Sequence, residues 1–162
     1  MENVKIPHRI LLLHYGKSSA FAGKNRRLRN ALAEAVIHEA NLMHKIRIDE
    51  SENIHSGSEN TTGHSIIDQV ADQISVATGK SVPYWIKQLA ANETIALHVT
   101  ENLIDNQLLS ANSNRGWFCK KLTSYSLNDK NNHQLVSNYL NQTSKSDVRS
   151  EITLAIMAKH EV

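Results

Sequence analysis

The regular spacing of apolar side chains between Asn25 and His44 is the strongest structural signal in this sequence. Apolar residues recur there at nearly helical intervals, with charged residues on the other face: Leu28, Leu32, Ala35, Val36, Ile37 and Met43. Such an amphipathic pattern predicts a helix over residues 25–44 that buries one face against the rest of the chain. This helix is the starting point for placing the other elements.

The composition is that of one folded domain. The chain has 162 residues, of which 40% are hydrophobic and 21% are charged. This length is sufficient to bury a core without disulfide or metal support, and we expect a single domain over residues 1–162. The only cysteine, Cys119, cannot form an internal disulfide, and no long apolar segment follows Met1. We therefore expect a cytoplasmic protein.

Short polar and apolar patterns follow the helix at 25–44. Residues 45–49 alternate in polarity and predict a half-buried strand. The segment Glu50–Gly63 is rich in Ser, Asn, Thr and Gly and predicts an exposed loop. A second helix is expected to begin at Ser65, with Asp68 completing a weak form of the capping box, and to end before Gly79.

The remaining chain predicts further helices and one hairpin. Ser81 and Pro83 open a short helix, and apolar residues from Ile95 predict another that ends near Asn106. Two β-prone runs, 108–111 and 117–123, flank a turn at 112–116, and two helices at 131–141 and 147–160 complete the chain. The order of elements predicts a mostly α fold with a small β component (α+β).

The sequence contains no complete catalytic, nucleotide or metal motif. His38-Glu39 begins like the helix of the zinc proteases, but Leu42 stands where the second histidine is needed. Gly16-Lys17-Ser18 resembles the end of a phosphate-binding loop, but position 11 is Leu where that loop needs glycine. We therefore expect no catalytic residue, metal or cofactor, and a protein that binds its partner without transforming it.

Four cations lie at the beginning of the helix at 25–44. They are Lys24, Arg26, Arg27 and Arg29. The N-terminal end of a helix favours anions, and its free N–H groups bind phosphate. The cluster therefore predicts a site for an anionic head group, and the alternative is a solvated basic turn.

A second group of residues adjoins the predicted turn. Arg115, Trp117, Phe118, Lys120 and Lys121 combine two large aromatic rings with three cations. Indole rings lie at the head-group level of a bilayer, and cations contact anionic lipid there. We expect this hairpin to contact a membrane. In the alternative, one ring packs in the core and the other covers the edge of the sheet.

A helix followed by a hairpin also occurs in winged-helix modules, which bind nucleic acid or protein. In that alternative the helix at 93–107 would precede the wing. It carries Glu93, Glu101 and Asp105 and no Lys or Arg, so it would repel phosphate. Nucleic acid is therefore disfavoured as a partner, whereas a protein partner is compatible with the sequence.

Several segments resemble the Golgi phosphoprotein 3 family. The resemblance extends over most of the chain and rests on the order of the elements and on the segments 10–13, expected as an early strand, 32–40, 44–48, 82–89, 101–109 and 125–129. It implies a mostly helical domain with a protruding β-hairpin. Eukaryotic members of the family bind phosphatidylinositol 4-phosphate through a tryptophan and several arginines, insert the hairpin into the membrane and act as adaptors.

The lipid ligands of the family are not matched residue by residue. Its tryptophan and first arginine correspond to Lys24 and Ala33, and two later arginines correspond to Glu93 and Ala96. A shift of four residues would place Arg29 on the first arginine. The resemblance implies a non-enzymatic adaptor at an anionic, phosphoinositide-like membrane, and we expect the four cations and the hairpin to make the contact.

Overall fold

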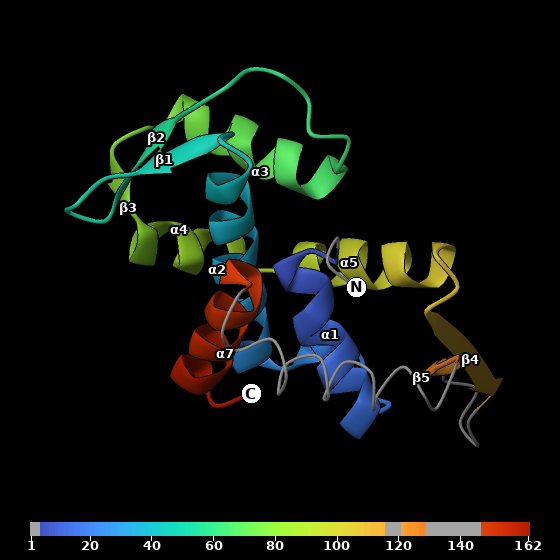
Figure 1. The fold of residues 1–162 in the computed structure, drawn as a ribbon. Helices are drawn as coiled ribbons and strands as arrows, with labels where there is room; N and C mark the ends of the chain where they lie inside the picture. Colours follow the sequence, from blue (N-terminus) through green and yellow to red (C-terminus); the bar gives the residue numbers. More distant parts are fainter. Residues whose placement is uncertain (1–3, 116–120, 129–146) are drawn as a thin grey trace.

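The computed structural model describes residues 4–115, 121–128 and 147–162. Figure 1 shows a mostly helical molecule with two small antiparallel sheets, which confirms the predicted fold class. The elements are α1 (Ile6–Lys17), the 3₁₀ helix η1 (Ala22–Lys24), α2 (Arg26–Leu42), β1 (Ile46–Ile48), β2 (Asn53–Ser56), α3 (Ser65–Val76), β3 (Lys80–Ser81), α4 (Val82–Leu89), α5 (Thr94–Asp105), β4 (Leu109–Arg115), β5 (Lys121–Leu127) and α7 (Val148–His160).

Helix α2 runs through the middle of the molecule and contacts α1, α3, α4, α5 and α7 (Figure 1). The side chain of Asn25 caps it by accepting hydrogen bonds from the N–H groups of Arg27 and Leu28, at 3.0 and 3.2 Å. Such a cap satisfies donors that have no partner within the helix. The apolar residues Leu28, Leu32 and Val36 are buried, so the predicted helix is confirmed.

The early strand expected at Ile10–Leu13 is wrong, because these residues belong to helix α1. Pro7 lies in the first turn, where a missing N–H is harmless. All four residues are buried. A helix that is apolar on most sides loses the period that would identify it, and a short apolar run is then ambiguous between strand and helix.

The first sheet has the order β1–β2–β3 and covers one end of α2 together with α3 (Figure 1). The predicted strand at 45–49 is confirmed by β1. The exposed loop predicted at Glu50–Gly63 is wrong in part, because Asn53–Ser56 form β2 and Ile54 is fully buried. Strands β2 and β3 have four and two residues and lie beside a polar segment, so they give little sequence signal, and pairing across the sheet stabilises them.

Helices α3, α4 and α5 confirm the predicted segments. The Ser81 hydroxyl caps α4 by accepting a hydrogen bond from the Tyr84 N–H at 3.4 Å. The capping box expected at Ser65 is wrong. Instead, the Asp68 carboxylate accepts a hydrogen bond from the N–H of Thr62 at 3.0 Å, so it stabilises the loop before α3.

The second sheet is the hairpin of β4 and β5, which Figure 1 shows at one end of the molecule beyond α5. The predicted turn at 112–116 is misplaced, since residues 112–115 pair with residues 121–124. At the base of the hairpin, the ring of Tyr125 contacts the rings of Tyr15 and Phe21. The last predicted helix is confirmed by α7, whereas the helix predicted at 131–141 lies outside the described residues.

Candidate functional site: a basic groove between α2, α4 and α7

Two of the four predicted cations are neutralised by carboxylates from distant elements. The Lys24 Nζ lies 2.9 Å from the Glu93 carboxylate, and the Arg27 guanidinium lies 2.6 Å from that of Glu161. Each pair is solvent-exposed, so both cations form ordinary surface ion pairs. The four cations therefore do not form one head-group site, and Lys24 and Arg27 are the weaker candidates.

Arg29 is held in place by backbone carbonyls. Its Nε donates to the Ala90 carbonyl at 3.0 Å, and its Nη1 donates to the Gly23 carbonyl at 2.7 Å. Carbonyl oxygens orient the guanidinium without cancelling its charge. Gly23 allows the close packing here, because a Cβ at this position would lie 2.5 Å from the Phe21 ring. Arg29 is thus a pre-positioned cation at the junction of η1, α2 and α4.

Arg26 and Arg29 open onto a groove of about 620 Å³ between α2, α4 and α7. Two more cations join them there, Lys87 from α4 and Lys159 from α7. The other lining residues are Asn30, Pro83, Ile86, Ala90 and Ala91. None of these residues is acidic, so the groove combines a partly apolar wall with four cationic side chains. This is the chemistry expected of a site for an anionic group on a larger molecule.

Lys159 differs from the other three cations because a carboxylate compensates it. Its Nζ lies 2.8 Å from the buried carboxylate of Glu34, which also lies 2.6 Å from the Nε2 of His160. Burial alone would raise the pKa of Glu34. The His38 ring, whose Nε2 lies 3.8 Å away, and hydrogen bonds from Lys159 and His160 outweigh burial and lower this pKa from 4.5 to about 2. Arg26, Arg29 and Lys87 have no ion pair within the described ranges.

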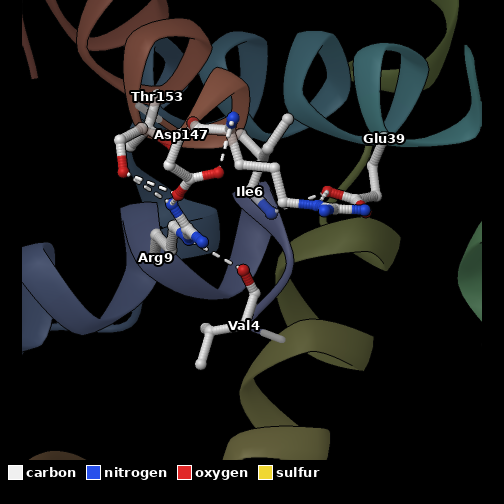
Figure 2. A network of polar contacts seen from close by, with 8 residues as sticks. Val4, Ile6, Arg9, Glu39, Asp147 and Thr153 are labelled. Atoms are coloured by element: carbon white, nitrogen blue, oxygen red, sulfur yellow. Dashed lines mark hydrogen bonds and ion pairs between the residues drawn. The ribbon is translucent and has the colours of Figure 1, made fainter. Parts of the chain in front are cut away.

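A network of buried charges fixes α7 against α1 and α2, as Figure 2 shows. The Arg9 guanidinium, which is 3% exposed, lies 2.6 Å from the Asp147 carboxylate. The fully buried carboxylate of Glu39 lies 2.8 Å from the Arg149 guanidinium and also accepts the Ile6 N–H at 3.1 Å. These contacts position α7 and therefore set where Lys159 meets the groove.

The structure describes only part of the predicted membrane hairpin. Arg115 and Lys121 form the last residue pair of β4 and β5 before residues 116–120. Trp117, Phe118 and Lys120 lie outside the described residues. The predicted bilayer contact by these rings therefore stays a prediction.

Sequence reasoning missed Lys87 and Lys159. Lys87 is one cation on a short helix, and Lys159 lies near the C-terminal end of another, where basic residues are common. Nothing in their local sequence links them to Arg26 or Arg29. Only the packing of α4 and α7 against α2 brings the four side chains to one groove.

Other kinds of site find no support in the described part of the chain. Within residues 4–115, 121–128 and 147–162, no group of three or more His, Cys, Asp or Glu side chains could hold a metal ion. Over the same ranges, no helix has both the length and the apolar character required to cross a bilayer. Helix α5, which precedes the hairpin, exposes Glu101 and carries no Lys or Arg. That surface does not suit a nucleic-acid backbone.

Comparison with protein families places the chain in a known one. A family model described as Golgi phosphoprotein 3 (GPP34) matches residues 6–159, which is nearly the whole chain. None of the curated proteins matches this sequence. The matched range includes α1 and α2, the hairpin and most of α7, so every cation of the basic groove lies within it or at its last residue.

Proposed function

The chain belongs to the Golgi phosphoprotein 3 (GPP34) family, and from this premise we propose that it is a non-enzymatic binding or adaptor domain that attaches peripherally to anionic membranes. In this proposal the basic groove receives a phosphorylated lipid head group. The hairpin supplies a second contact through Trp117, Phe118 and the cations beside them.

The observation that carries the proposal is the uncompensated charge of the groove. Arg26, Arg29 and Lys87 converge on one hollow whose lining includes no carboxylate. Each cation near an anionic bilayer contributes about 1 kcal/mol of attraction. Arg29 is already oriented by two carbonyls, so it loses little conformational freedom when it binds a phosphate.

Vesicle co-sedimentation tests the role of the groove. Phosphatidylcholine vesicles with and without a phosphoinositide are compared, using the wild-type chain and the double variant Arg26→Gln with Lys87→Gln. At about 1 kcal/mol per cation, the double variant should bind phosphoinositide vesicles on the order of 30-fold more weakly. Added salt should weaken wild-type binding as well.

The matched control is Lys24→Gln with Arg27→Gln. It removes the same net charge close to Arg26, but both cations are already paired with carboxylates. We expect it to retain most of the binding. Equal losses in the two double variants would show that net charge alone attracts the chain, and the groove would then be rejected as the site.

A third variant, Trp117→Ala, tests the hairpin. Removing the indole should weaken binding to all vesicles that contain anionic lipid, by about 1–3 kcal/mol of lost apolar burial. Binding that does not change on this substitution would eliminate the hairpin contact. A duplex DNA arm in the same buffer addresses the winged-helix alternative, and stronger binding to DNA than to vesicles would contradict the proposal.

A further inference from the structure

A second cavity, which we call the histidine cavity, lies between the beginning of α1, the loop before α3 and the end of α5. Its volume is about 360 Å³, and a smaller cavity of about 140 Å³ shares three of its residues, His8, His64 and Asn102. None of its residues lines the basic groove. The two sites are therefore separate features of the molecule.

The polar lining of the histidine cavity consists of basic and amide side chains. Lys5, His8 and His64 line the larger cavity, and His98 of α5 joins the two histidines, without Lys5, in the smaller one. Asn102 and Asn106 complete the polar lining. No Asp or Glu lines either cavity. A cavity bordered by one ammonium and two imidazoles, with a third imidazole in the adjoining cavity, has a positive potential that increases as the imidazoles are protonated.

The hydrogen bonds of His8 fix which ring nitrogen carries the proton. Its Nε2 lies 2.8 Å from the Oδ1 of Asn102, and the Asn106 Nδ2 donates to the same oxygen at 3.1 Å. The oxygen is therefore an acceptor, so Nε2 carries the hydrogen. The other nitrogen, Nδ1, is buried and has no hydrogen-bond partner in the described residues. Protonation of the ring creates an N–H group there that requires an acceptor or a nearby anion.

Burial and neighbouring positive charges together lower the pKa values of both rings. Burial lowers the pKa of His8, and the charges of His64 and Lys5 lower it further. The hydrogen bond to Asn102 and the carboxylate of Glu39 raise this pKa, but they do not outweigh burial. Burial and the charge of Lys5 also lower the pKa of His64, whereas the carboxylates of Glu39 and Asp68 raise it by less.

Other groups already engage the two carboxylates. That of Glu39 pairs with Arg149 and also lies 3.7 Å from the Nζ of Lys5, and that of Asp68 accepts hydrogen bonds from Thr62. Neither lines the cavity. An anion inside it would add to the cavity the negative charge that its lining does not provide.

We propose that the histidine cavity binds a small tetrahedral oxyanion of the phosphate or sulfate type. Its cationic side chains come from the beginning of α1 and the loop before α3, and His98 of α5 lines the adjoining cavity, so they approach from different directions. A tetrahedral oxyanion presents acceptor oxygens in all directions, whereas a carboxylate presents them in one plane. Binding strengthens as the pH falls, because His8 and His64 gain positive charge. The same thermodynamic linkage requires the anion to raise the pKa values of both rings.

Nuclear magnetic resonance of the imidazole C–H groups tests this proposal on the full chain. Inorganic sulfate is the probe, since it remains a dianion over the whole range in which histidines titrate. Sodium chloride at matched ionic strength is the reference. Sulfate should raise the pKa values of His8 and His64 by about one unit, which corresponds to about tenfold tighter binding to the protonated form. The exposed His44 should show no such change.

Variants separate a specific site from general attraction. His8→Gln and His64→Gln should each weaken sulfate binding at pH 5.5 by about tenfold. The control His44→Asn changes a histidine with φ of 58°, a backbone conformation that asparagine tolerates, and should bind like the wild type. If chloride produces the same pKa changes as sulfate, or if both glutamine variants bind sulfate normally, the proposal is wrong. Each variant is first checked for an unchanged melting temperature. If His8→Gln does not fold, sulfate binding by His64→Gln alone tests the proposal.

A further experiment distinguishes a free oxyanion from the phosphate of a lipid head group. Inorganic phosphate and phosphoinositide vesicles are each added to the Arg26→Gln, Lys87→Gln double variant. A response of His8 and His64 to inorganic phosphate alone identifies a soluble ligand, whereas a response to vesicles identifies a lipid head group. Because that variant lacks two cations of the groove, failure of the proposed membrane function leaves the sulfate result unaffected.

Discussion

Helices α1 and α7 lie side by side against the same helix, α2, yet different forces hold them (Figure 1). Helix α1 buries a nearly continuous apolar surface that includes Ile6, Ile10 and Leu11. Helix α7 buries only Ser150, Thr153 and Ile156, and it is fixed instead by buried charges on its neighbours (Figure 2). Apolar burial depends little on pH or salt, whereas ion pairs depend on both. The two helices should therefore respond differently to the same perturbations.

The position of one wall of the basic groove depends on the ion pairs that hold α7. Arg26 and Arg29 belong to α2, which buries an apolar face, while Lys159 belongs to α7, which buried charges hold in place. Replacing a buried ion pair by apolar residues is often neutral or stabilising, so such pairs do not by themselves explain stability. The buried charges of α1 and α2 instead determine where α7 lies, because each of them has to contact its partner on α7.

The largest effect is expected from Leu11→Ala in α1. Leu11 is fully buried, so the substitution leaves a cavity and should lower the free energy of unfolding by about 2–5 kcal/mol. Urea unfolding at neutral pH measures this change. The matched control is Leu154→Ala in α7, where the leucine is 40% exposed and the expected change is within about 0.5 kcal/mol. Similar losses in the two variants would contradict the distinction between the helices.

An intermediate, pH-dependent effect is expected from Glu34→Gln beneath α7. The pKa of Glu34 is about 2 in the folded chain and 4.5 ordinarily. Its ionised form therefore stabilises the fold fully above pH 4.5, and this stabilisation is lost as the pH falls toward 2. The variant should be less stable than the wild type by about 1–3 kcal/mol at pH 7, since it loses charge-assisted hydrogen bonds.

Urea unfolding at a series of pH values checks this expectation. The difference between wild type and Glu34→Gln should shrink steadily as the pH falls below 4.5. Asp147, whose pKa is also lowered to about 2, remains in both proteins and contributes equally to both curves. A difference that stays constant from pH 7 to the acid limit would mean that the Glu34 charge does not stabilise α7.

The smallest effect is expected from Arg27→Gln at the beginning of α2. The Arg27 and Glu161 side chains are 65% and 70% exposed, so their ion pair is screened by water and salt. The free energy of unfolding should change by no more than about 1 kcal/mol, as measured by thermal unfolding. A larger loss would show that the end of α7 is held at this surface pair and not by the buried charges.

Local signals predicted most of the helices. The amphipathic spacing located α2, and Ser81 with Pro83 located the beginning of α4. These signals lie within a few residues of the element they specify, so no tertiary information is needed. Helix α1 was misassigned because its apolar run is buried on most sides and has no polar face to reveal the period. Strand β2 was missed because its pairing with β1 and β3 defines it.

The candidate site was only half predicted. Of the four cations chosen from the sequence, Arg26 and Arg29 line the groove, whereas Lys24 and Arg27 are paired with carboxylates. Sequence position alone does not distinguish these pairs. The distinction depends on Glu93 and Glu161, which fold back from distant parts of the chain.

By itself, the sequence determined the identity and limits of most elements and the presence of a basic segment at the first residues of α2. These properties follow from periodicity, capping and composition, which act over a few residues. The tertiary structure alone decided which cations stay free of carboxylates, that Lys87 joins them, and that His8, His64 and Lys5 share one cavity. The physical reason is that charge compensation acts through space, so it depends on side chains that only folding brings together.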